Sequence, residues 1–123
     1  MSPRHVPASV SELARISLLQ GLGGPALLEL AARMRREQVP AGRALVVEGD
    51  EDDRFYVVLS GMLTVSQNAL GARRVLRPGD YFGEVAAAMG VPRTATVHAL
   101  TPVTVASCDR ETFEQLVKPL FTD

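Results

Sequence analysis

The sequence predicts an α+β domain in which two short helices precede an antiparallel β-unit and one short helix follows it. Three observations predict this class. Apolar residues recur with a helical period before residue 38, short β-rich runs alternate with turn residues from residue 39 onward, and the helical period returns after residue 108. A chain of 123 residues, 46% of them hydrophobic, can bury one core but not two, so residues 1–123 are interpreted as a single domain.

Two helices are expected in the N-terminal part, residues 9–38. Apolar residues recur densely over residues 10–19, which favours a first helix. Three glycines then precede Pro25, and proline is well tolerated in the first turn of a second helix. The apolar stripe of that second helix consists of Leu27, Leu30, Ala31 and Met34.

Six short β-rich runs follow between residues 39 and 108. They are residues 44–47, 55–59, 63–66, 74–76, 94–99 and 103–107. Turn residues separate them at roughly even spacing, which is typical of an antiparallel barrel or sandwich rather than of βαβ units. A last helix is expected over residues 109–118, with Asp109 as its N-cap and Pro119 ending it soon afterwards.

Composition excludes several classes of function. The 13 basic and 14 acidic residues give a net charge of −1, whereas a protein held on nucleic acid by phosphate contacts is usually basic. No apolar run approaches the length of a membrane span, so we expect no membrane insertion. The single cysteine, Cys108, fits a reducing cytoplasm and a small buried side chain. Two distant histidines cannot supply a catalytic metal site, so no metal is expected.

One segment, residues 82–95, interrupts the β-pattern. Gly83 precedes a helix-forming run over residues 84–89, and Gly90 can end that run in the left-handed conformation. The free N–H groups at the start of such a turn can bind an anion. Glu84 can accept hydrogen bonds from two hydroxyls, and Arg93 can fork onto a phosphate, so together they suit a sugar phosphate. The alternative is an ordinary solvated salt bridge, which contributes little.

Residues 83–86 (Gly-Glu-Val-Ala) and 92–95 (Pro-Arg-Thr-Ala) resemble the phosphate-binding cassette of cyclic nucleotide-binding domains. The order of the surrounding glycines and strands resembles that family as well. The matching positions are Gly42, Gly49, Asp50, residues 55–61, Leu76, residues 78–80 and Phe82. The resemblance covers about residues 10–121 and constrains many positions together with their spacing.

This resemblance implies an eight-stranded antiparallel β-roll, a jelly-roll-like barrel, with two N-terminal helices, a short cassette helix and one C-terminal helix. The β-roll would span residues 39–108, the cassette residues 82–95 and the last helix residues 109–118. The ligand would be cAMP or cGMP, with no further cofactor. Glu84 would bind the ribose 2′-hydroxyl and Arg93 the cyclic phosphate. The expected ligand-binding residues are Gly83, Glu84, Val85, Ala86, Arg93, Thr94 and Ala95.

The choice of base stays open at the level of sequence. In the family, a threonine at the place of Thr94 can hydrogen-bond guanine, but threonine also occurs there in members that prefer cAMP. We favour cAMP slightly, with cGMP as the other candidate. Family members usually continue into a longer helix that folds over the base, and this sequence ends at Asp123, so we expect a site open on the base side.

The expected function is therefore regulatory and not enzymatic: ligand binding would move the helices and bias an effector domain or partner protein outside this sequence. A location in the cytoplasm is expected, with tethering to a membrane protein in a larger chain as a further option. One alternative is a ligand-free interaction module with the same fold, and metal-dependent catalysis is the weakest. The acidic group at residues 51–53 and the basic pair at residues 73–74 are interpreted as a charged turn and a solvated face.

Overall fold

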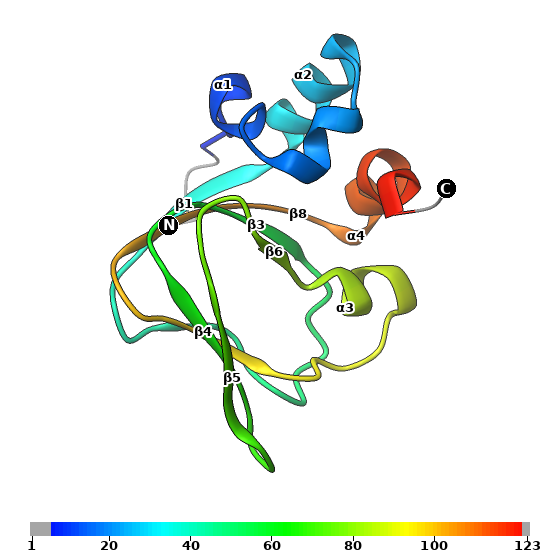
Figure 1. Ribbon diagram of the computed structural model, residues 1–123. Helices are drawn as coiled ribbons and strands as arrows, with labels where there is room; N and C mark the ends of the chain where they lie inside the picture. The colour runs from blue at the N-terminus through cyan, green and yellow to red at the C-terminus, as the bar shows by residue number, and fades with distance from the viewer. Residues whose placement is uncertain (1–5, 122–123) are drawn as a thin grey trace, which may run out of the picture.

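The computed structural model describes residues 6–121, with the side chains of residues 72 and 73 left out. Two four-stranded antiparallel sheets form the body of the described part (Figure 1). The first has the order β1-β8-β3-β6, with β1 Arg35–Val39, β8 Val103–Cys108, β3 Phe55–Ser60 and β6 Tyr81–Phe82. The second has the order β2-β7-β4-β5, with β2 Ala44–Val46, β7 Thr96–Ala99, β4 Leu63–Gln67 and β5 Gly71–Leu76. The expected α+β class and antiparallel pairing are confirmed.

Successive residues of β3 enter two different cores, because side chains of a strand alternate between its faces. Tyr56 and Val58 pack into the apolar cluster between the two sheets. Phe55 and Val57 point the other way and pack against the helices. Strand β8 alternates in the same manner, which explains why it is buried along its whole length.

Helical segments cover the outer face of the first sheet (Figure 1). Those before the sheets are α1 (Val10–Leu13), the 3-10 turn η1 (Ser17–Gly21) and α2 (Gly24–Arg33). Those after β8 are α4 (Arg110–Thr112), the π-helical turn η2 (Phe113–Val117) and the 3-10 turn η3 (Lys118–Phe121). The short helix α3 (Glu84–Met89) lies between β6 and β7.

The first helix is broken where a continuous one was expected. Leu13, Ile16 and Leu19 are all buried, at a spacing of three residues. A continuous α-helix would rotate such a row away from the core, whereas a 3-10 turn has three residues per turn. The chain therefore leaves the α-helix after Leu13 and re-enters helical structure at Ser17.

Helical structure was expected up to residue 38, and this was wrong for the last residues. The backbone becomes extended at Met34, and β1 starts at Arg35. Strand β1 pairs with β8 from Arg35↔Ser107 to Val39↔Val103. A run of charged and amide side chains carries no strand signal of its own. Its extended conformation therefore depends on pairing with the edge of β8. The two-residue strand β6 also lacked a sequence signal.

Pro119 does not end the C-terminal helical region, contrary to expectation. The 3-10 turn η3 starts at Lys118 and runs to Phe121, so Pro119 occupies its second position. The fixed φ of proline, about −65°, is compatible with the backbone of a 3-10 turn. The N-cap was predicted correctly: the carboxylate of Asp109 accepts a hydrogen bond of 2.9 Å from the backbone N–H of Thr112.

Candidate functional site

Helix α3 begins and ends at glycines in the left-handed conformation, as the sequence predicted. Gly83 has φ 90° and Gly90 has φ 67°. A Cβ atom at Gly83 would lie 2.6 Å from the carbonyl oxygen of Arg54 and 2.9 Å from Nη1 of Arg93. Only glycine therefore lets the start of α3 approach the guanidinium this closely.

Arg93 is buried and is held from one side only. Its side chain is 3% exposed, and its Nη2 donates to Oδ2 of Asp52 at 3.0 Å and to the carbonyl of Arg54 at 2.9 Å. Its Nε and Nη1 are buried without a hydrogen-bond partner. Unpaired donors on a buried charged group are costly, so these two nitrogens favour an acceptor that carries negative charge.

The turn before β3 positions Asp52 and Arg54. Oδ1 of Asp52 accepts a hydrogen bond of 3.1 Å from the backbone N–H of Arg54, which orients the carboxylate. The guanidinium of Arg54 donates through Nε and Nη2 to the buried Oγ of Ser107 at 3.1 and 3.0 Å. These bonds tie the turn to β8, so the groups that hold Arg93 are themselves fixed by the first sheet.

A pocket with a volume of about 110 Å³ lies between α3 and the second sheet. All the residues expected to contact a ligand line it, namely Gly83, Glu84, Val85, Ala86, Arg93, Thr94 and Ala95. Val46, Val65, Arg74, Phe82, Pro92 and Val97 complete the lining. The structure thus brings the predicted residues together around one opening, while their contacts with a ligand stay a prediction.

No ion pair joins Glu84 to Arg93, which argues against the simple salt-bridge interpretation. Arg93 pairs with Asp52 instead. Glu84 lies half-buried in the first turn of α3 and makes no side-chain hydrogen bond or ion pair with another described residue. Its carboxylate is therefore available to hydroxyl groups of a ligand.

Two charged residues of the site were missed by sequence reasoning. Asp52 was interpreted as part of a charged turn, and Arg74 as part of a solvated pair. The sequence could not place either residue at the site, because their positions depend on contacts with distant parts of the chain. Asp52 bonds to Arg93, and Arg74 pairs with Val65 of β4. Two backbone hydrogen bonds hold Arg93 against the loop after β2. The N–H of Arg93 donates to the carbonyl of Asp50 at 2.8 Å, and the N–H of Gly49 donates to the carbonyl of Arg93 at 2.9 Å. A glycine followed by acidic residues before a strand is the one signal the sequence offered.

Two further groups with shifted pKa values, Cys108 and Tyr56, do not line this pocket. Burial raises the pKa of the Cys108 thiol to about 12, which suits the expected inert core residue. Burial also raises the pKa of Tyr56, whose ring stacks on Phe82 with centroids 4.7 Å apart. Within residues 6–121, no group of three or more metal-ligating side chains forms a site. Over the same range, every helix falls short of the length and apolarity that a membrane span needs.

The family model of the cyclic nucleotide-binding domain matches residues 36–119, well over half of the chain. The chain belongs to this family. The resemblance drawn from the cassette and the structural glycines is therefore confirmed.

Relatives of this cyclic nucleotide-binding domain include regulatory proteins of eukaryotes. The chain is 36% identical over 108 residues to a cAMP-dependent protein kinase regulatory subunit of Eremothecium gossypii, and the match covers 88% of this chain and 24% of that protein. The regulatory domain of Toxoplasma gondii PKA with cAMP has a TM-score of 0.85 at 28% identity, over 90% of this chain and 44% of that one. The regulatory subunit of a cAMP-independent protein kinase A from Trypanosoma brucei has a TM-score of 0.86 at 25% identity, over 91% and 41%. The chain thus spans about a quarter of the curated relative.

Proposed function

We propose that this domain binds a 3′,5′-cyclic nucleotide in the pocket beside α3 and acts as a regulatory rather than a catalytic unit. One observation carries the proposal: Nε and Nη1 of the buried Arg93 have no partner, while its Nη2 is held by Asp52 and Arg54. A cyclic phosphate has one negative charge and two exocyclic oxygens. It would neutralise the charge of the guanidinium and offer acceptor oxygens to its unpaired nitrogens.

The other contacts follow from the residues around the pocket. The amides of Gly83, Val85 and Ala86, with Thr94 or Ala95, would complete the phosphate cradle. Since Glu84 has no partner among the described residues, its carboxylate can accept from the ribose 2′-hydroxyl. This contact requires a ribonucleotide. No metal or further cofactor enters the proposal.

Family membership alone does not determine the ligand. The names of the relatives from Eremothecium gossypii and Toxoplasma gondii favour cAMP, and cGMP is the other candidate. The Trypanosoma brucei relative is described as cAMP-independent, so the same fold also occurs without dependence on that ligand.

We propose that the signal leaves the pocket through the helices. Ala87 of α3 is fully buried in the cluster that contains Phe113 and Val117 of the C-terminal turns. At the other end of α3, a Cβ atom on Gly90 would lie 2.5 Å from Nη1 of Arg110. A ligand that moves α3 would therefore displace the C-terminal turns and bias an effector domain or partner protein outside these residues. We propose a cytoplasmic location, without nucleic-acid partners or direct insertion into a membrane.

Titration calorimetry with cAMP and cGMP tests the proposed function. We expect saturable binding that Arg93→Ala weakens by about ten- to a hundredfold, because a charged hydrogen bond contributes about 1.5–3 kcal/mol. Arg93→Lys should restore binding only in part, since lysine keeps the charge but loses the fork. Arg77→Ala is the matched control, because Arg77 is exposed and does not line the pocket.

Thermal unfolding of each variant shows whether the fold survives the substitution. Absence of heat with either nucleotide up to millimolar concentration would contradict the proposal. That result would favour a ligand-free interaction module with the same fold.

A further inference from the structure

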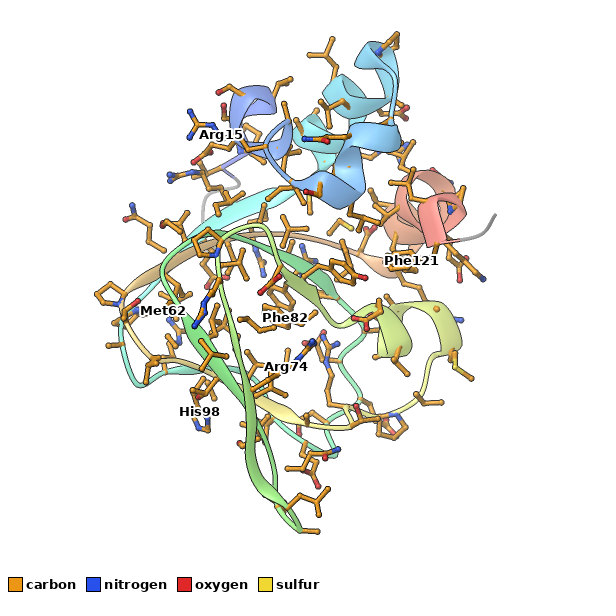
Figure 2. All side chains as sticks on the ribbon, viewed as in Figure 1. Arg15, Met62, Arg74, Phe82, His98 and Phe121 are labelled. Carbon is orange, nitrogen blue, oxygen red and sulfur yellow. The ribbon has the colours of Figure 1, made fainter. Side chains whose placement is uncertain are left out.

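Three segments meet at the end of the second sheet, beside the pocket. They are the loop after β2 (residues 47–50), the end of β4 with the turn after it (residues 67–70) and the last residues of the cassette with the start of β7 (residues 93–96). Figure 2 shows the pocket residues Arg74 and Phe82 on the side of the second sheet that faces α3, and the β4–β5 hairpin extends beyond them. Hydrogen bonds join the three segments, so the end of the cassette is held from two sides.

Glu48 ties the loop after β2 to both of the other segments. Its Oε1 accepts a hydrogen bond of 2.9 Å from the backbone N–H of Asn68, directly after β4. Its own backbone N–H donates to Oγ1 of Thr96 at 2.9 Å. The neighbour of Asn68, Gln67, is in turn fixed by its pairing with Gly71 across the hairpin. The backbone that carries Gln67 is therefore held firmly beside the cassette.

Gln67 holds the main chain of the cassette through its side chain. Nε2 of Gln67 donates a hydrogen bond of 3.0 Å to the carbonyl oxygen of Thr94. The carbonyl oxygen of the preceding residue, Arg93, accepts a hydrogen bond of 2.9 Å from the backbone N–H of Gly49. Both peptide groups that flank Thr94 thus have a partner in another segment.

These two hydrogen bonds direct the N–H groups of Thr94 and Ala95. In a trans peptide group, the C=O and N–H bonds point in opposite directions. The two N–H groups therefore point away from the loop after β2 and away from Gln67. Neither of them donates a hydrogen bond to another described residue. Because Thr94 and Ala95 both line the pocket, these two donors are free to bind a ligand there.

We propose that Gln67 is a positioning residue for the cyclic phosphate. By holding the carbonyl of Thr94, it keeps the N–H groups of Thr94 and Ala95 directed at the phosphate oxygens. The proposal rests on the proposed function, and it assigns a role to a residue that does not itself line the pocket. Since Gln67 acts only through the main chain of the cassette, it affects every 3′,5′-cyclic nucleotide alike, whatever the base.

Titration calorimetry with cAMP and cGMP, on the unmodified chain and on Gln67→Met, tests the proposal. Methionine has a similar length but no N–H group, so this variant loses the bond to Thr94 with little change in volume. We expect it to weaken both nucleotides by the same factor, about three- to tenfold, as the loss of one hydrogen bond predicts. Gln67→Glu keeps the shape of the side chain and also lacks the donor, so it should weaken binding at least as much.

Gln38→Met is the matched control, because Gln38 is an exposed glutamine on β1 that does not line the pocket. It should leave both affinities unchanged. Thermal unfolding of all three variants shows whether each one is folded at the temperature of the titration.

NMR of the backbone amides separates positioning from a general structural role. An amide proton that bonds to a phosphate oxygen shifts downfield. At saturating nucleotide, this shift should become smaller for Thr94 and Ala95 in Gln67→Met, and it should stay unchanged for Gly83 and Ala86 at the start of α3.

Unchanged affinity of Gln67→Met and Gln67→Glu, a loss confined to one nucleotide, or equal reduction of all four amide shifts overturns the positioning role, while cyclic-nucleotide binding stands. Failure of the unmodified chain to bind either nucleotide overturns both proposals.

Discussion

Oδ2 of Asp52 lies 3.0 Å from Nη2 of Arg93, and this contact joins the turn before β3 to the loop after α3. The arginine side chain is 3% exposed and the aspartate side chain 39% exposed, so the pair reaches from the interior to the surface. Asp52 satisfies one end of the guanidinium and leaves Nε and Nη1 for a ligand. The carboxylate therefore orients the arginine without blocking the pocket.

The first prediction concerns Asp52→Ala. Without this carboxylate, the buried guanidinium of Arg93 loses its counter-charge, and we expect the ligand-free domain to lose about 1–2 kcal/mol of unfolding free energy. A bound cyclic phosphate would supply the missing negative charge, so the loss should shrink in the presence of saturating nucleotide. Thermal unfolding with and without nucleotide measures both values. Asp53→Ala is the neighbouring control, and an equal loss in both conditions would show that Asp52 acts only on the turn.

The second prediction concerns Gly83→Ala. The Cβ atom would collide with the carbonyl of Arg54, in addition to the strain of a positive φ. Gly79→Ala is the matched control, because Gly79 has φ 97° but open space where its Cβ would lie. We expect Gly79→Ala to cost about 1–2 kcal/mol and to leave nucleotide affinity unchanged.

Gly83→Ala should cost more than this and weaken nucleotide binding at least about tenfold, since α3 must move away from Arg93. Urea unfolding and calorimetry provide the two measurements. Indistinguishable behaviour of the two variants would mean that close approach of α3 to Arg93 has no role.

The third prediction concerns the pH dependence of the cap at Asp109. Hydrogen bonds from Thr112, from its backbone first, lower the pKa of this carboxyl. A lowered folded pKa means that the stabilisation is present above the unfolded value of about 3.9 and is lost as the pH falls through the folded value. Asp109→Ala should therefore cost about 1 kcal/mol at pH 7, and this gap should narrow in acid. Urea unfolding of both proteins, from pH 7 down into acid, measures this difference in unfolding free energy. A difference that stays constant with pH would contradict the role of the Asp109 carboxylate as a cap.

The fourth prediction concerns the reactivity of Cys108. The thiol is fully buried, and burial raises its pKa to about 12, so thiolate is scarce at neutral pH. A thiol reagent should leave the folded domain unmodified at pH 8 and react fully in denaturant, which mass spectrometry can follow. Rapid modification of the folded domain would show that β8 opens readily at its C-terminal end.

Local signals in the sequence were sufficient for the helices and strands whose pattern is strong. The run 84–89 between two glycines became α3, and the carboxylate of Asp109 caps α4, because both depend on neighbouring residues. Strand β1 could not be predicted in this way. Its residues Arg35–Val39 are mostly polar, and their extended conformation comes from pairing with β8, far along the chain.

The sequence by itself determined the fold class, the family and the cassette. The cassette could be recognised because its glycines, its helix-forming run and the arginine that follows them are close together in the chain. Only the tertiary structure decided what surrounds the guanidinium of Arg93 and which strand carries the second pocket arginine. Asp52 and Arg74 are distant from the cassette in sequence, and their places depend on strand order and register. Hydrogen bonding between strands sets that register across the whole sheet, so no short stretch of sequence contains it.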